Sequence, residues 1–224
     1  MLCGAERGGS SAYAGGGDAR SVLDSGAVVA VLLREPVLAQ RWGGPSALAD
    51  FTVGGLARHL ANQLTVTVSR LGEAPGGTVI PVLEHFTGNS WVTSGVDAED
   101  NIGIRRRGEQ AAAAMTAAGL ADEVDVALGT LRRVVPAEPA DRLVDLGEWA
   151  LTVDDFLLTR VLELVVHVDD LAVSLGVATP ALPEAATGAA IQLLARLAVW
   201  RHGPVAVVRG LARRERAPGS IAAL

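Results

Sequence analysis

The fold is decided by the stretch Thr152–Gly176, which reads TVDDFLLTRVLELVVHVDDLAVSLG. Thr152 offers a hydroxyl that can cap a helix, and two acidic residues follow in the first turn, where the helix dipole favours negative charge. When the residues are placed on a wheel of 3.6 residues per turn, apolar side chains occupy most of the circumference. The stretch therefore predicts a long helix that lies at the centre of the protein.

A narrow polar stripe interrupts the apolar surface of this helix. Arg160, His167, Asp170 and Ser174 all lie within about 60° of Glu163 on the wheel. On a central helix, such a stripe points inward and indicates a cavity. Glu163 and His167 are four residues apart, so their side chains are neighbours on one helix face and can bind one ion.

A third metal ligand is expected from another helix, because catalytic zinc typically takes three protein ligands, often two His and one Glu. Thr52 is placed to cap a second helix, whose apolar positions recur at helical spacing: Val53, Leu56, Leu60 and Leu64. His59 borders this apolar stripe, with Gln63 as the other polar group on that side, and is the candidate third ligand. Asp170 lies one turn beyond His167 and is expected to orient the His167 ring.

The spacing alone leaves other interpretations open. A Glu and a His four residues apart also occur by chance on helices, and a stripe of Glu, His and Asp is also typical of a solvated face. His59 by itself is equally consistent with a core or surface histidine. The remaining histidines, His85 in a loop and His202 at a helix end, are expected to be exposed polar residues.

The rest of the chain predicts an all-α bundle with long connections, since no convincing run of alternating strands is present. Residues 1–17 are rich in Gly, Ser and Ala and are predicted to be a disordered leader. An irregular excursion is expected over 71–101. Further helices are expected over 18–42 with an interruption at Pro36, over 103–118 and 122–135 with a break at Gly119, from Pro183 to about Trp200, and from Pro204 towards Ala212.

Composition narrows the class of protein. The chain has 224 residues, half of them apolar, with a formal charge of -6, so it lacks the clustered basic surface typical of nucleic-acid binders. Cys3 is the only cysteine, which excludes an intrachain disulfide. The longest uncharged apolar run, Gly26–Leu33, is far shorter than the roughly 20 residues that cross a bilayer. We expect a soluble, cytoplasmic protein, and its use of Arg without any Lys is typical of a GC-rich, actinobacterial genome.

Three motifs resemble one known family. The stretch FTVGGLARHL over 51–60 resembles the WTVGDLAAHL helix start of mycothiol-dependent maleylpyruvate isomerases and related DinB-like proteins. RVLELVVHVDDL over 160–171 is similar to their R-x-x-E-x-x-x-H-x-x-D-L helix, and LARRERAP over 211–218 to their closing L-x-G-R element. The resemblance covers most of the chain after the leader. Phe51 replaces the usual Trp, and Arg213 stands where the family often has Gly.

The resemblance implies a DinB-like four-helix bundle over 18–180, with a C-terminal helical extension over 181–224 that packs on it. It implies that His59, Glu163 and His167 bind zinc or another divalent metal, and that Arg214 holds an anionic substrate. Asp170 and Arg160, on the same polar stripe as the ligands, are the candidate catalytic residues.

The resemblance also implies mycothiol as the thiol cosubstrate, which attacks a small electrophile in an isomerisation or an S-transfer. Cys3 lies in the expected leader and is not expected to supply the sulfur. Two alternatives remain open, a non-catalytic metal-binding or regulatory protein and a zinc hydrolase that needs no thiol. The expected partners are small molecules, neither nucleic acid nor membrane, and a homodimer is one of the oligomeric states left open.

Overall fold

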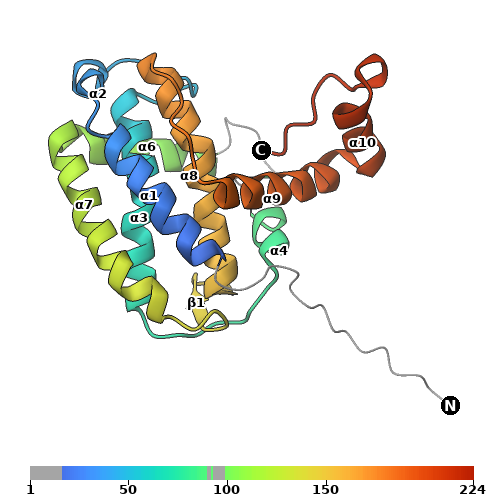
Figure 1. Ribbon diagram of the computed structural model, residues 1–224, viewed down its shortest axis with the longest axis horizontal. Coiled ribbons are helices and arrows are strands. Elements are labelled where there is room, and N and C mark those ends of the chain that lie inside the picture. Colours follow the sequence, from blue (N-terminus) through green and yellow to red (C-terminus); the bar gives the residue numbers. More distant parts are fainter. Residues whose placement is uncertain (1–16, 90–91, 93–98) are drawn as a thin grey trace.

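The centre of the computed structural model, which describes residues 17–89, 92 and 99–224, is a bundle of four helices. They are α1 (Gly17–Leu32), α3 (Val53–Gly72), α7 (Ala117–Val134) and α8 (Val153–Leu175). Helices α1 and α3 each pack against both α7 and α8, so the four surround one core (Figure 1). The predicted all-α fold and the predicted four-helix bundle are confirmed.

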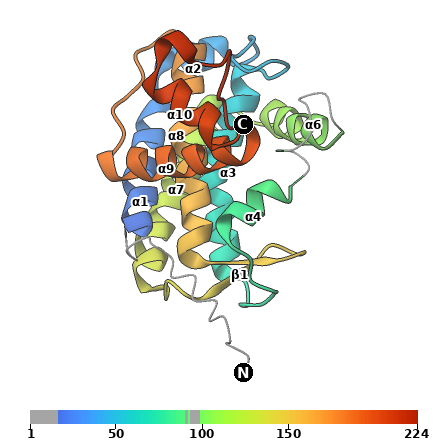
Figure 2. The same cartoon turned by 90° about the vertical axis from the view of Figure 1, so that its right-hand side faces the viewer.

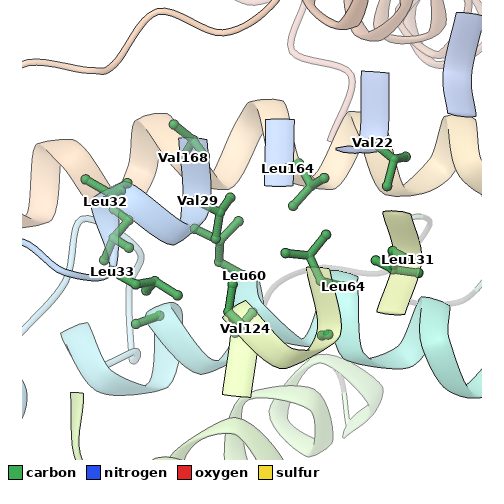
Figure 3. Close-up of a cluster of buried hydrophobic side chains, with 14 of the residues drawn as sticks. Val22, Val29, Leu32, Leu33, Leu60, Leu64, Val124, Leu131, Leu164 and Val168 are labelled. Carbon is green, nitrogen blue, oxygen red and sulfur yellow. The ribbon is translucent and has the colours of Figure 1, made fainter. Parts of the chain in front are cut away.

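The core of the bundle is built from aliphatic side chains of all four helices (Figure 3). Each helix contributes at least one fully buried side chain to it: Val29 from α1, Leu60 from α3, Val124 from α7 and Leu164 from α8. Helix α8 also contacts α9 (Glu184–His202) through a second apolar cluster that includes Leu158, so apolar neighbours cover it on several sides. The predicted central position of this helix is therefore confirmed.

The two helices that carry the candidate ligands begin at the threonines expected from the sequence. The Thr52 hydroxyl oxygen accepts a hydrogen bond from the Gly55 amide at 2.9 Å, and the Thr152 hydroxyl oxygen accepts one from the Asp155 amide at 3.1 Å. Helix α8 ends at Gly176, whose φ of 71° is left-handed and favours glycine. Both helices thus have a defined start, and the register of their side chains follows from it.

Helix α6 (Glu99–Ala113) is tied to the start of α3 by a carboxylate. Glu109 accepts hydrogen bonds from the Thr52 amide at 2.8 Å and from the Thr52 hydroxyl at 2.9 Å. A Cβ atom at Gly55 would clash with the Glu109 carboxylate and displace it from these two hydrogen bonds. At Gly54 a Cβ atom would lie 2.7 Å from Trp42 Cε2, so both glycines of the FTVGGLARHL stretch lie where the packing at the helix start is close.

Shorter elements surround the bundle. They are α2 (Pro36–Arg41), α4 (Val82–Thr87), a 3-10 turn η1 (Val135–Ala137), strands β1 (Leu143–Asp145) and β2 (Ala150–Thr152), α10 (Pro204–Ala212) and a second 3-10 turn η2 (Arg214–Arg216). Helix α9 lies across α8 and α1, and α10 packs on α9 and projects beside the bundle (Figures 1 and 2). No helix within the described ranges has the length and apolar character needed to cross a bilayer.

Three local predictions need correction. The break between α6 and α7 falls at residues 114–116 and not at Gly119, because Thr116 caps α7 by accepting a hydrogen bond from the Gly119 amide. The excursion over 71–101 contains α4, and the antiparallel pair β1–β2 was not expected. Strands of three residues are too short to show an alternating pattern. The interruption at Pro36 is confirmed, and residues 1–16 of the expected leader lie outside the described residues.

Candidate metal centre

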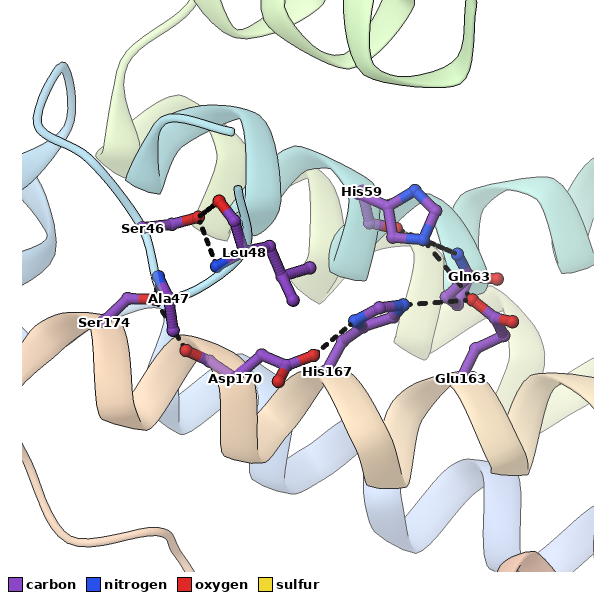
Figure 4. Close-up of polar contacts among 9 residues, drawn as sticks. All are labelled: Ser46, Ala47, Leu48, His59, Gln63, Glu163, His167, Asp170 and Ser174. Atoms are coloured by element: carbon purple, nitrogen blue, oxygen red, sulfur yellow. Dashed lines mark hydrogen bonds and ion pairs between the residues drawn. The ribbon is translucent and has the colours of Figure 1, made fainter. Parts of the chain in front are cut away.

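Three side chains from two helices meet at one point beside the bundle core (Figure 4). His59 comes from α3, and Glu163 and His167 come from α8. The Nε2 atoms of both histidines lie 3.3 Å from the same oxygen, Glu163 Oε2. The three candidate ligand atoms all lie within 4.8 Å of one another. The structure therefore brings together the three residues that the sequence singled out.

The three side chains are mostly but not completely buried. The exposed fraction is 24% for His59, 13% for Glu163 and 16% for His167. Part of each side chain is therefore accessible to solvent. Three such residues could hold a metal ion, and catalytic zinc typically has three protein ligands with a further position for water or substrate.

Asp170 orients His167. The Asp170 Oδ2 atom lies 2.9 Å from His167 Nδ1, so this carboxylate accepts the ring N–H and leaves Nε2 to face Glu163. Further along the stripe, the Ser174 hydroxyl donates to the Asp170 carbonyl and accepts from the Ala47 amide at 2.8 Å, which ties the loop before α3 to α8 (Figure 4). These contacts place the Asp170 carboxylate at the second ring nitrogen of His167.

Gln63 connects His59 to Arg160. Its amide nitrogen donates to the His59 carbonyl at 3.0 Å and lies 3.5 Å from His59 Nε2. Its amide oxygen accepts from Arg160 Nη1 at 2.7 Å. Arg160 also lies over the ring of Phe156, with its guanidinium carbon 5.3 Å from the ring centroid. In the sequence Gln63 is only a polar neighbour of His59, because its link to Arg160 crosses from one helix to the other.

The charges at the centre are strongly coupled. Burial disfavours a charged Glu163, but hydrogen bonds from His167 and His59 outweigh it and hold the pKa of this carboxyl well below its usual range. Burial likewise opposes a charged His167, yet its hydrogen bonds to Asp170 and Glu163 raise its pKa to about 9. The metal-free centre thus carries a buried carboxylate beside a protonated histidine. A divalent cation can take the place of that proton.

The other predicted residues lie away from these contacts. Arg214 is exposed in η2, and no hydrogen bond or ion pair among the described residues joins it to the three candidate ligands. His202 ends α9, but it is half-buried, with Nε2 2.7 Å from the Ala222 carbonyl oxygen. Cys3 lies outside the described residues.

The prediction for His85 is wrong. This residue lies on α4 and is half-buried, and its Nδ1 accepts a hydrogen bond from the Trp149 indole N–H at 3.0 Å. The two residues are 64 positions apart, and no local pattern in the sequence links them.

Two long helices that bring two imidazoles and one carboxylate to a common point define a helical-bundle protein with a candidate metal centre. The family model described as the mycothiol maleylpyruvate isomerase N-terminal domain matches residues 23–172, which is more than half of the chain. The chain belongs to this family, and the resemblance noted from the sequence is confirmed. His59, Glu163 and His167 all lie within the matched residues, whereas Arg214 lies beyond them. Neither the curated proteins nor the solved structures give a significant match.

Proposed function

We propose that this protein binds one divalent metal, zinc, through His59, Glu163 and His167, and uses it to activate the thiol of mycothiol against a small electrophile. The observation that carries the proposal is the convergence of two histidine Nε2 atoms on one oxygen of Glu163, each at 3.3 Å. Two His and one Glu are a donor set found in catalytic zinc sites. The orienting contact from Asp170 to His167 and the partial exposure of the ligands support the same assignment.

Each neighbouring residue has a role in this proposal. A bound cation lowers the pKa of a coordinated thiol, so that the thiol reacts as a thiolate at neutral pH. Asp170 holds His167 in the orientation that presents Nε2, and Gln63 steadies His59. Arg160, a largely buried cation beside Glu163, favours a negatively charged substrate at the centre. We further propose Arg214 as a contact for the substrate anion, on the strength of the family's closing element.

The chemistry that follows is addition of the thiolate to an electrophilic carbon. With a cis-alkene diacid, the S–C bond forms, the double bond becomes single and rotates, and elimination of the thiolate gives the trans isomer. With other electrophiles, addition or displacement leaves a sulfur conjugate. Isomerisation and S-transfer therefore share their first step at the same centre.

The test is to measure zinc content and mycothiol consumption together. The purified wild-type chain should hold about one zinc per molecule and accelerate loss of mycothiol with at least one member of a panel of electrophiles. His167→Ala should lose both properties, whereas His202→Ala, which removes a histidine outside the centre, should keep both. Zinc without thiol consumption would indicate a binding or regulatory protein, and turnover without any thiol would indicate a hydrolase.

A further inference from the structure

A third histidine, His85, is held by a hydrogen bond on helix α4, which packs on α8. His85 lies one turn into α4, and the segment that leads into this helix pairs with β2: the Ala150 amide donates to the Thr78 carbonyl at 2.8 Å, and the Ile80 amide donates to the Ala150 carbonyl at 3.0 Å. Trp149, which donates to His85 Nδ1, directly precedes Ala150. Both partners of this hydrogen bond are thus anchored to the same short strand.

The hydrogen bond from Trp149 fixes the tautomer of His85. An indole N–H can only donate, so the Nδ1 atom of His85 must be the acceptor. The neutral ring then carries its single proton on Nε2, and no described residue accepts a hydrogen bond from that atom. Burial, helped by the positive charge of Arg160 and opposed by the negative charge of Glu163, lowers the pKa of His85 to about 4. The ring is consequently a neutral N–H donor at physiological pH.

His85 lies near the part of α8 that carries Arg160 and Glu163, because the next residue, Phe86, shares a buried apolar cluster with Leu158 and Leu162 of α8. The charges of Arg160 and Glu163 also act on the pKa of its ring. Helix α4 packs on α8, and Figure 2 shows it in front of α3 and α8. Phe86 and Trp149 flank the imidazole edge to face, with ring centroids 5.2 Å and 5.8 Å away. This packing limits rotation of the ring and leaves Nε2 as its available polar atom.

We propose that His85 is a further catalytic residue, whose Nε2–H donates to an oxygen of the electrophile, and that Trp149 is the positioning residue that fixes this donor. The inference rests on the proposed thiol addition. When the S–C bond forms, the π electrons of the alkene move towards the adjacent carboxyl or carbonyl group, and negative charge develops on its oxygen. A preorganised neutral donor stabilises that oxygen without transferring a proton. The same hydrogen bond persists until elimination returns the electrons.

The first arm of the test uses the zinc-loaded full-length chain, mycothiol and maleate. His85→Ala should lower kcat by about 100-fold, the scale measured for removal of one oxyanion donor, and should leave zinc content unchanged. His85→Gln, whose side-chain amide can donate from a similar position, should recover part of this loss. Trp149→Phe should lower kcat less and should turn the nitrogen-15 NMR signature of His85 from a single Nε2–H tautomer into a mixture of tautomers.

The second arm needs no turnover, and so separates failure of this inference from failure of the proposed function. In the zinc-loaded wild-type chain without thiol, maleate should shift the Nε2 resonance of His85, and His85→Ala should bind maleate at least about tenfold more weakly, as expected for a lost hydrogen bond to a charged group. His202→Ala should bind like the wild type. Equal affinities for wild type and His85→Ala, an Nδ1–H tautomer, or no binding of maleate would each overturn the inference, whether or not mycothiol is consumed.

Discussion

Zinc binding is expected to displace a proton from His167, and this exchange sets how affinity depends on pH. The pKa of His167 is about 9 in the metal-free protein, since its hydrogen bonds to Asp170 and Glu163 outweigh the effect of burial. Only the unprotonated Nε2 can bind a metal. At pH 7 most of the rings are then protonated, so apparent affinity lies about two orders of magnitude below its limit. Affinity should rise about tenfold per pH unit up to pH 8.5 and level off above pH 9.

The assay is titration calorimetry at pH 7 in two buffers of different ionisation enthalpy, which counts the protons released per zinc bound. Competition with a chromophoric chelator at pH 6.5, 7.5 and 8.5 gives the slope independently. His167 should contribute about one proton at pH 7. Asp170→Asn keeps a hydrogen-bond acceptor for Nδ1 but removes the charge that holds the proton. This variant should release fewer protons and show a flatter pH profile, whereas His202→Ala should match the wild type.

The opposite result has a clear meaning. If wild-type protein binds zinc with the same affinity at pH 7 and pH 8.5, His167 is already neutral before the metal arrives. The proton would then not occupy the place of the metal, and the reasoning from the Glu163–His167–Asp170 contacts would be refuted.

Three further predictions concern stability. Gly55→Ala should lower the melting temperature, because its Cβ would displace the Glu109 carboxylate from the Thr52 amide and hydroxyl, whereas Gly188→Ala, in an α9 position with open space around it, should stabilise by about 0.5–1 kcal/mol. Leu164→Ala should cost about 2–5 kcal/mol in urea unfolding with an unchanged m-value, since this fully buried side chain leaves a cavity. In metal-free protein, the lowered pKa of Glu163 contributes stability that is present above its ordinary value of 4.5 and lost as pH falls through the folded pKa. The difference in unfolding free energy between wild type and Glu163→Gln should therefore shrink from pH 6 to pH 3.

The parts of the fold that depend on local chemistry could be predicted from the sequence. The starts of α3 and α8 follow from Thr52 and Thr152, whose hydroxyls satisfy amides three residues later. The polar stripe follows from helical periodicity, and Glu163 and His167 are neighbours because they are one turn apart. The convergence with His59 is different, because the packing of α3 on α8 is not local. For that step, the resemblance supplied what spacing could not.

The features that the sequence did not indicate depend on contacts between distant segments. Helix α4 has six residues, too few for a clear period, and its entry is set by pairing with β2 about 70 residues later. The sequence predicts His85 to be an exposed loop residue, because no local pattern indicates its hydrogen bond with the indole of Trp149. A glycine commonly ends a helix, so the sequence predicts the break before α7 at Gly119. In the structure Thr116 caps α7, and Gly119 lies within its first turn.

The candidate metal ligands lie on long helices, whereas the proposed substrate contacts lie on short elements. This separation allows the metal site to be stable while the substrate site varies. Metal coordination tolerates errors of only about 0.2 Å, so the ligands belong on capped helices that are anchored by fully buried side chains, such as Leu60 on α3 and Leu164 on α8. The groups that would contact a substrate are less constrained by the core. His85 and Trp149 lie on a six-residue helix and next to a three-residue strand, outside the four-helix bundle. Substitutions there should alter substrate preference without loss of zinc, whereas substitutions at His59, Glu163 or His167 should remove both together.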